Sequence, residues 1–228
     1  MKIEIWSDVI CPFCYIGKAE LETALAQWGG EAEISHRAFR LSPGEAPTPV
    51  EQMLGRKYGL TPDQVKANLA NVEAHAARAG LEFHLAGTIA GDTTDAHRLI
   101  ALAATHSRQA DAVAALYRAY FTDGRNILDR AVLYQIGAEI GLEAADIDAA
   151  FTSSDIDMSI ALDQRQAQAY GVRGVPFVVV DGKFAVSGAQ PVQAFLQTLQ
   201  AAAAEAEKTA VIGEGEVCGV DGCEPAQK

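Results

Sequence analysis

The N-terminal segment constrains the fold most, because a strand pattern passes there into a helix pattern through two closely spaced cysteines. Residues 2–6 alternate apolar and polar side chains, as a half-buried strand does. Cys11 and Cys14 follow, and a helical pattern runs from residue 12 to residue 28, where two glycines end it. Residues 33–41 indicate a second strand. The sequence therefore predicts a β-α-β opening with the cysteines at the junction of strand and helix.

A long helical stretch separates this opening from a second strand-rich segment. Residues 50–170 carry successive alanine-rich amphipathic patterns, and Thr61-Pro62 is typical of a helix N-terminus. Around residues 176–186 the period drops to two on either side of an Asp-Gly turn signal, which predicts a β-hairpin. A last helix starts at Pro191. The predicted order is β-α-β, helical block, β-hairpin, helix, which is an α/β fold.

Composition limits the class of protein and its partners. The 228 residues are 49% hydrophobic and 21% charged, as in a globular protein with a sizeable core. A net charge of −12 disfavours nucleic acid and anionic membranes as partners. The N-terminus shows no export signal, and no apolar run is long enough to span a bilayer. We therefore expect a cytoplasmic protein, in which cysteines more often serve chemistry than structural disulfides.

Cys11 and Cys14 are the candidate catalytic residues. Disulfide exchange needs a thiolate, and a free cysteine with a pKa of about 8.5 is mostly protonated at neutral pH. At the start of a helix the Cys11 sulfur faces unpaired N–H groups and the positive end of the helix dipole, while Pro12 suits the first turn. Cys14 lies one turn further on, so we predict that Cys11 attacks and Cys14 resolves. A zinc ligand pair and two inert core cysteines are the alternatives.

Three segments together resemble one known family. They are residues 7–17 (Ser-Asp-Val-Ile-Cys-Pro-Phe-Cys-Tyr-Ile-Gly), 96–99 (Ala-His-Arg-Leu) and 174–177 (Gly-Val-Pro-Phe). Through them the chain resembles the FrnE-type branch of the DsbA-like thioredoxin superfamily over about residues 1–205. The resemblance implies a thioredoxin fold interrupted by an inserted all-helical domain.

The same resemblance implies a division of the chain. A discontinuous thioredoxin-like domain is expected at residues 1–43 and 160–208, with the helical domain inserted at residues 44–159. Residues 209–228 are expected to form a flexible tail.

The resemblance also implies a site around the dithiol. A cis peptide between Val175 and Pro176 is expected to lie against the turn that carries Cys11, with Pro12 and Phe13 beside it. Pro176 would shape the substrate groove and keep metal off the thiols. Neither a cofactor nor a metal is required. The expected partners are protein disulfides and thiols, or low-molecular-weight thiols such as glutathione.

Further side chains carry weaker expectations. Asp8 either relays protons to Cys14 or caps the helix, and His97 either lines the cleft or caps a helix. His75, His84 and His106 receive no role. Met53 and Met158 are expected in the core.

Cys218 and Cys223 flank a turn that bears glycine and aspartate in the tail. An accessory redox pair, a structural disulfide and a metal-binding pair are all compatible with this spacing.

Two rival functions come from other classes. Kappa-class glutathione transferases and hydroxychromene-carboxylate isomerases belong to the same superfamily but typically carry serine in place of the first cysteine, so Cys11 and Cys14 argue against that branch. A redox-sensing or chaperone-like binding module is the rival outside enzymology. The physiological substrate, the direction of electron flow, the recycling partner and the oligomeric state stay open.

Overall fold

The computed structural model describes residues 1–210, 217–219 and 222–224, with side chains as far as residue 206. It opens with strand β1 (Lys2–Ser7), helix α1 (Pro12–Trp28) and strand β2 (Glu33–Ala38). Gly29 ends α1 in the left-handed conformation, with a φ of 74° that suits glycine. The predicted second strand extended to Leu41, which is wrong: the Leu41 N–H leaves the sheet and donates to Asp8 Oδ2 at 2.7 Å.

A four-stranded sheet of order β2-β1-β5-β6 forms the centre of the molecule. β1 pairs in parallel with β2 and antiparallel with β5 (Phe177–Val180), which returns as β6 (Phe184–Ser187). The predicted hairpin is confirmed, and Asp181 and Gly182 turn it with φ values of 49° and 66°.

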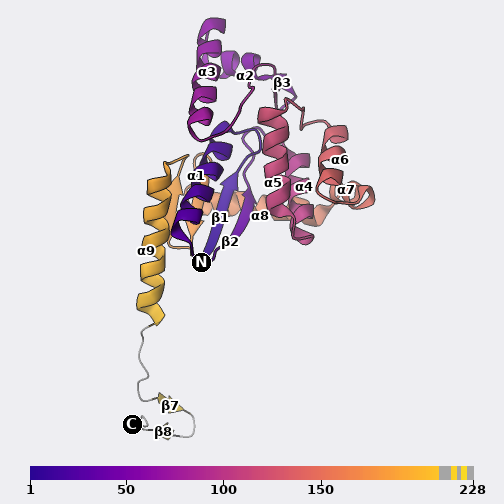
Figure 1. The fold of residues 1–228 in the computed structure, drawn as a ribbon. Coiled ribbons are helices and arrows are strands. Elements are labelled where there is room, and N and C mark those ends of the chain that lie inside the picture. Colours follow the sequence, from indigo (N-terminus) through magenta and orange to yellow (C-terminus); the bar gives the residue numbers. More distant parts are fainter. Residues whose placement is uncertain (211–216, 220–221, 225–228) are drawn as a thin grey trace.

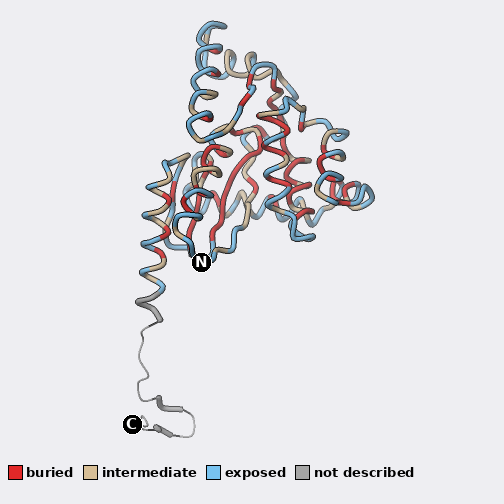
Figure 2. Tube along the Cα trace, viewed as in Figure 1, coloured by how far each residue is buried: buried red, intermediate tan, exposed pale blue. Residues whose placement is uncertain are grey.

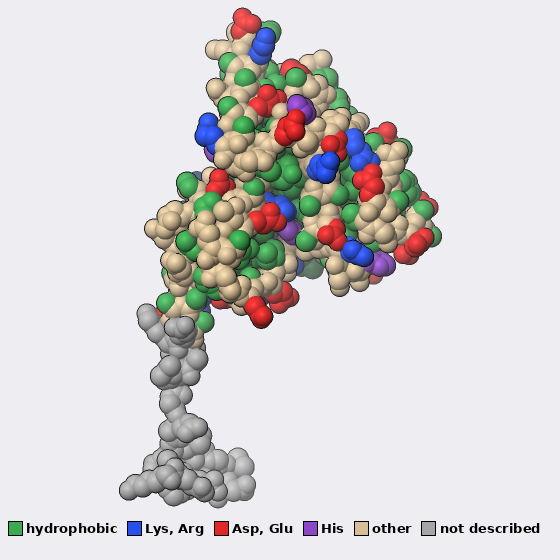
Figure 3. All heavy atoms as spheres, in the orientation of Figure 1, with side chains coloured by type: hydrophobic (Ala, Val, Ile, Leu, Met, Phe, Trp, Pro, Cys, Tyr) green, Lys and Arg blue, Asp and Glu red, His purple; other side chains and the backbone are tan. Residues whose placement is uncertain are grey.

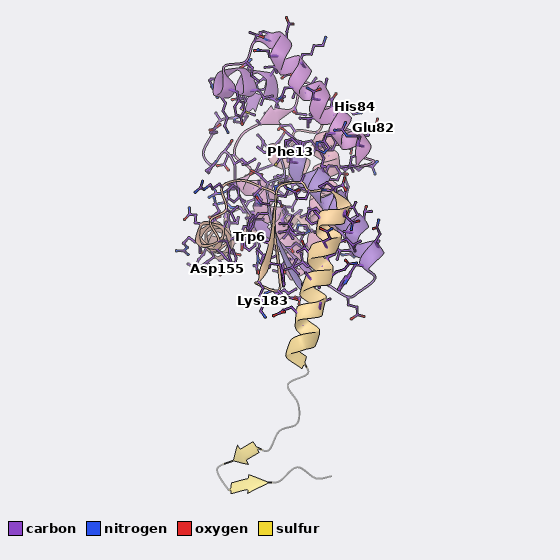
Figure 4. All side chains as sticks on the ribbon, turned by 90° about the vertical axis from the view of Figure 1, so that its left-hand side faces the viewer. Trp6, Phe13, Glu82, His84, Asp155 and Lys183 are labelled. Atoms are coloured by element: carbon purple, nitrogen blue, oxygen red, sulfur yellow. The ribbon has the colours of Figure 1, made fainter. Side chains whose placement is uncertain are left out.

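Helices cover both faces of this sheet. α1 and α9 (Val192–Ala210) lie side by side on one face, where Ile3, Val178 and Phe195 share a buried cluster (Figure 1). On the other face Trp6 lies toward α8 (Ser154–Ala169), and its indole Nε1 donates to the Asp163 carbonyl at 2.9 Å (Figure 4). Successive side chains of β1 point to opposite faces of the sheet, so its apolar residues pack against the helices on both faces.

The insertion is helical apart from one short ladder, in which β3 (Thr48–Pro49) pairs antiparallel with β4 (Ile89–Ala90). Thr61 caps α3 through a capping box with Gln64, in agreement with the prediction. The expected domain boundary at residues 159–160 falls inside α8. The other helices of the insertion are α2 (Val50–Tyr58), α3 (Pro62–Arg78), α4 (Thr94–Thr105), α5 (Gln109–Tyr117), the π-helix η1 (Arg118–Thr122), α6 (Arg130–Glu139) and α7 (Ala144–Ala150).

The dithiol lies in the core that α1 shares with the insertion. Cys11 and Cys14 belong to the same buried cluster as Leu99 and Leu116 of the helical insertion. Figure 2 shows buried residues concentrated in β1 and the neighbouring helices, whereas much of α3 is exposed. Met158 is 61% exposed, so its predicted place in the core is wrong.

In the tail, β7 (Val217–Gly219) pairs antiparallel with β8 (Gly222–Glu224), and Cys218 lies opposite Cys223 in register. The predicted flexibility of residues 209–228 falls largely outside the described residues. Within the described part of the chain, no helix is long and apolar enough to cross a bilayer.

Candidate active site

Cys11 and Cys14 lie where β1 hands over to α1. Cys11 is the N-cap of the helix, Pro12 occupies the first helical position, and no side chain satisfies the helix N-terminus. Pro12 has no N–H and the Cys14 N–H donates to the Cys11 carbonyl at 3.0 Å, so the positive end of the helix dipole is the feature of the helix N-terminus that acts on the Cys11 sulfur. Both residues are free cysteines, 6% and 2% exposed respectively.

The segment before β5 closes over Cys11. The Val175–Pro176 peptide is cis, and the Cys11 thiol donates to the Val175 carbonyl across 3.6 Å. α1 can approach this segment because Gly17 lacks a side chain: a Cβ there would lie 3.0 Å from Pro176 Cγ. Gly17 thus allows the close approach of α1 to the segment that contains Pro176.

Cys14 has a different environment. Burial, followed by the hydrogen bond and charge of Cys11, raises the pKa of the Cys14 thiol well above its ordinary value. Hydrogen bonding to the Asp8 backbone lowers this pKa and so acts in the opposite direction. Cys14 is therefore a thiol at neutral pH and can donate a hydrogen bond to the Cys11 sulfur.

An apolar cavity of about 560 Å³ opens beside Cys11, between α1 and the insertion. Phe13, 41% exposed, stands at its edge, with its ring 6.0 Å from that of His75 on α3 (Figure 4). On the face shown in Figure 3, hydrophobic side chains gather in the hollow between α3 and α5. The cavity is lined by Ile10, Cys11, Pro12, Phe13, Leu41, Ser42, Val50, Met53, Leu54, Lys57, Tyr58, Leu60, Asn68, Leu69, Val72, Leu85, Thr88, Ala90, Tyr120 and Phe121.

Most of this lining was missed by the sequence reasoning. Met53, expected in the core, lines the cavity instead. Apolar spacings of three and four residues on α2 and α3, such as Val50 with Leu54 and Leu69 with Val72, were a usable signal for two apolar helix faces. They could not indicate that the faces border a cavity.

Aromatic rings stack between the first turn of α1 and the insertion. Tyr15, next to Cys14, stacks on Tyr117 of α5 with ring centroids 4.9 Å apart and on Phe83 at 5.5 Å. These contacts fix the first turn of α1 against the insertion.

Asp8 and His97 meet in the interior, at 0% and 3% exposure. His97 Nε2 lies 3.4 Å from Asp8 Oδ1, and neither atom has a hydrogen-bond partner. Neither residue caps a helix: Cys11 begins α1 without a side-chain bond, and His97 lies inside α4, after the N-cap Thr93. The capping alternatives are therefore wrong.

A second cavity, of about 160 Å³, opens on the His97 side. About half of its lining is polar and comes from residues such as Ser7, His36, Arg37, His97 and Asp163, so we call it the polar cavity. The other half is apolar and includes Ala38, Ile100, Ala101, Ala104 and Ile160. Arg37 also forms an ion pair with Glu4, across 2.5 Å.

Metal binding by the dithiol alone would leave the ion with two protein ligands. Among the described residues, no group of three or more His, Cys, Asp or Glu side chains is arranged to hold an ion.

Comparison with known proteins agrees with this geometry. The family model of the DSBA-like thioredoxin domain matches residues 2–200. A probable DsbA oxidoreductase from Streptomyces coelicolor is 38% identical, with a TM-score of 0.86 over 100% of both chains. The uncharacterized protein YwbO of Bacillus subtilis is 26% identical over 66% of this chain and 71% of its own.

A more distant structure shares the fold. The cytosolic disulfide reductase DsbM from Pseudomonas aeruginosa, solved with glutathione, is 18% identical, with a TM-score of 0.62 over 92% of this chain and 100% of its own. The dithiol at the helix N-terminus, the matched family model and the full-length similarity lead to one conclusion. The chain belongs to the DsbA-like thioredoxin family and has its thioredoxin fold with a helical insertion.

Proposed function

We infer that this protein is a thiol–disulfide oxidoreductase in which Cys11 attacks and Cys14 resolves. One observation carries the assignment: Cys11 lines the apolar cavity at the N-terminus of α1, whereas Cys14 is buried behind it and lines none of the described cavities. A substrate disulfide can therefore reach Cys11 first.

The exchange proceeds through a mixed disulfide. The Cys11 thiolate attacks a substrate disulfide, the substrate S–S bond breaks, and one substrate thiolate leaves. Cys14 then loses its proton and attacks the Cys11 sulfur, which forms the Cys11–Cys14 disulfide and releases the second substrate thiolate. The two departing thiolates take up protons. The reverse sequence oxidises a dithiol substrate, and the chemistry needs no external cofactor.

The substrate class that suits the cavity is a polypeptide with an apolar side chain near its cysteine. Among the described residues that line the cavity, Lys57 is the one charged side chain. Glutathione carries two carboxylates and would leave its charges poorly paired there, whereas an extended apolar segment removes its surface from water. Val175 and Pro176, beside the Cys11 sulfur, support the backbone of such a segment. A cytosolic location is part of this proposal, supported by the named location of the Pseudomonas relative.

The tail supplies an accessory redox pair in this proposal. Cys218 and Cys223 are paired in the backbone register of the β7–β8 ladder. This pair would exchange with the Cys11–Cys14 couple.

Two variants test the main assignment. Cys11→Ser should abolish reduction of insulin disulfides and refolding of scrambled ribonuclease, because no attacking sulfur remains. Cys14→Ser should accumulate mixed disulfides that are visible by mass spectrometry, because attack survives without resolution. Equal trapping by both variants, or full activity in Cys11→Ser, would reject the assignment.

A further inference from the structure

The apolar cavity beside Cys11 carries one positive charge that nothing in its lining balances. Lys57 of α2 is the one charged side chain among the described residues that line the cavity, so no carboxylate of the described residues lines it. The ion pairs among the described residues do not include Lys57. Since the whole protein has a net charge of −12, this cavity differs in sign from the molecule around it.

Lys57 continues the apolar face of α2. Val50, Met53 and Leu54 line the cavity together with Lys57, and their spacings of three, four and seven residues place side chains on one face of a helix. The three apolar residues are half-buried, whereas Lys57 is exposed. Seven helical residues span about 10 Å, and an extended polypeptide rises about 3.3 Å per residue. About three substrate residues would therefore cover this wall and bring a side chain to Lys57.

The neighbouring aromatic ring keeps the charge at the cavity. The Lys57 ammonium lies 5.9 Å from the centroid of the Tyr58 ring, within the range of a cation–π contact. Tyr58 also lines the cavity and is 60% exposed. A ring face attracts a cation without neutralising it, so the Lys57 charge stays available to a carboxylate of a ligand.

The helix terminus does not explain on which side of α2 this charge lies. Arg56 and Lys57 both belong to the last turn, where a cation interacts favourably with the helix dipole. Arg56 is exposed like Lys57 but does not line the cavity. The two residues therefore share their charge, their helix turn and their exposure, and they differ in their relation to the cavity.

We propose that Lys57 is a specificity-determining residue that binds an acidic side chain of the substrate polypeptide, while the apolar part of the same segment fills the cavity beside Cys11. The inference rests on the proposed function and narrows its substrate class to an apolar segment with one carboxylate near its cysteine. One cation matches one carboxylate, whereas a second carboxylate would find no cation among the described lining residues. Because the apolar segment excludes water from the cavity, the ion pair is less screened than a pair on the open surface.

The test uses peptides with blocked termini, so that one side chain carries the only carboxylate. Each peptide has one cysteine in an apolar segment, activated as a mixed disulfide with pyridine-2-thiol, which carries no carboxylate. Attack of the reduced protein on the peptide sulfur releases pyridine-2-thione, and its absorbance in stopped flow gives the second-order rate constant. Glutamate is placed in turn at each position within four residues of the cysteine, and glutamine at the same position gives the reference.

The wild-type protein should react about tenfold faster with glutamate than with glutamine at one position or at two neighbouring positions, because Lys57 occupies a fixed place in the cavity. Lys57→Gln should bring this ratio to about one, Lys57→Glu should invert it, and Lys57→Arg should restore most of it. Arg56→Gln is the matched control, since it removes the same charge from the same helix turn, and it should keep the wild-type ratio.

Three results would overturn the inference: a ratio near one at every position in the wild-type protein, an undiminished ratio in Lys57→Gln, or an equal loss of the ratio in Arg56→Gln. The last result would assign the preference to the general charge of α2. Failure of the wild-type protein to release pyridine-2-thione from any peptide would instead reject the proposed function itself, so the two failures are distinguishable.

Discussion

Two unlike cavities differ in their relation to the dithiol turn: one is lined by Cys11 and the other by His97. On the Cys11 side a mainly apolar cavity of about 560 Å³ opens toward α2 and α3, and on the His97 side a cavity of about 160 Å³ with a half-polar lining opens toward β2 and α8. The first can remove an apolar substrate segment from water, whereas the second is smaller and includes charged side chains in its lining. The difference shows that the two sides of the Cys-x-x-Cys turn offer different environments, and that Cys11 lines only the apolar one of these two cavities.

The contrast follows from which elements form each wall. The apolar wall comes mainly from the insertion, including Leu54 and Val72. The polar wall includes β2 and α8, which are held together by Arg37: it pairs with Glu4 across 2.5 Å and contacts Asp163 at 3.4 Å. Changes in one wall should therefore leave the function of the other intact.

A charge in the apolar wall should reduce the activity more than any other change outside the dithiol. Val72→Glu would place a carboxylate where an apolar substrate segment is expected, and reduction of insulin disulfides should fall about 100-fold because the charge resists desolvation. Reduction of the small neutral 2-hydroxyethyl disulfide should change much less. Leu162→Glu, at an exposed position of α8, is the control and should change neither rate. Equal losses for both substrates in Val72→Glu would mean that the cavity does not select polypeptides.

His36, in the polar wall, should make the stability of the protein depend on pH in the acid range. Burial, followed by the charge of Lys18, lowers the pKa of His36 to about 4, and its Nδ1 is buried without a hydrogen-bond partner. In the unfolded chain the imidazole takes up its proton near its ordinary pKa of about 6.5. The stability that the neutral ring contributes is therefore fully present above about pH 6.5 and is lost as the pH falls toward about 4.

Replacing this ring should flatten the pH dependence. Because His36 is only partly buried as a whole residue, we expect about 2 kcal/mol less acid-induced loss of unfolding free energy in His36→Gln, measured by urea titration between about pH 7 and pH 4. His106→Gln, on an exposed side chain, is the control. Parallel curves for wild type and His36→Gln would show that another group sets the acid limit.

Local signals in the sequence account for the parts of the fold that were predicted. Pro12 and Gly29 mark the ends of α1, and the Asp-Gly pair at residues 181–182 marks the hairpin, because each favours its conformation whatever packs around it. The end of β2 was not predictable in this way. It depends on Asp8, far away in sequence, which takes the Leu41 N–H.

The residues of the candidate site likewise fall into those that local sequence predicts and those that only the packed fold brings together. Cys11 and Cys14 carry their chemistry in their spacing, so the sequence alone placed them at the start of a helix. The contact of Asp8 with His97 joins residues 89 positions apart and is a property of the packed fold. Met158 shows the converse, since an apolar side chain alone does not decide whether a helix face is buried.

A smaller effect is expected where α1 meets the segment before β5. Gly17→Ala would place a Cβ 3.0 Å from Pro176 Cγ, so the neighbour must give way by a few tenths of an ångström. Alanine also favours the helix by up to about 1 kcal/mol, so stability should change little, while insulin reduction should fall about fivefold because the groove beside Cys11 is displaced. Gly55→Ala on α2, where the nearest atom would be 3.4 Å away, is the control. Unchanged activity in Gly17→Ala would show that the position of Pro176 does not limit turnover.

Loss of the tail should have the smallest effect on the redox behaviour of the protein. This experiment tests whether the tail cysteines exchange with Cys11 and Cys14. If Cys218 and Cys223 exchange with the main pair, deleting the residues after Val211 should shift the redox equilibrium of Cys11 and Cys14 with glutathione, by less than about tenfold, or 30 mV. The melting temperature should not change, because the deleted residues carry few large apolar side chains.

The double variant Cys218→Ser/Cys223→Ser separates the thiols from the rest of the tail and should reproduce the deletion. Mass spectrometry across a glutathione series would identify each disulfide, including any between Cys11 and the tail. Identical equilibria in all three proteins, without such a disulfide at any redox poise, would reduce the tail pair to a structural disulfide or a metal-binding pair. Metal analysis of the reduced full-length protein would then decide between these two, because cysteines bind a metal ion as thiolates and therefore only when the disulfide is reduced.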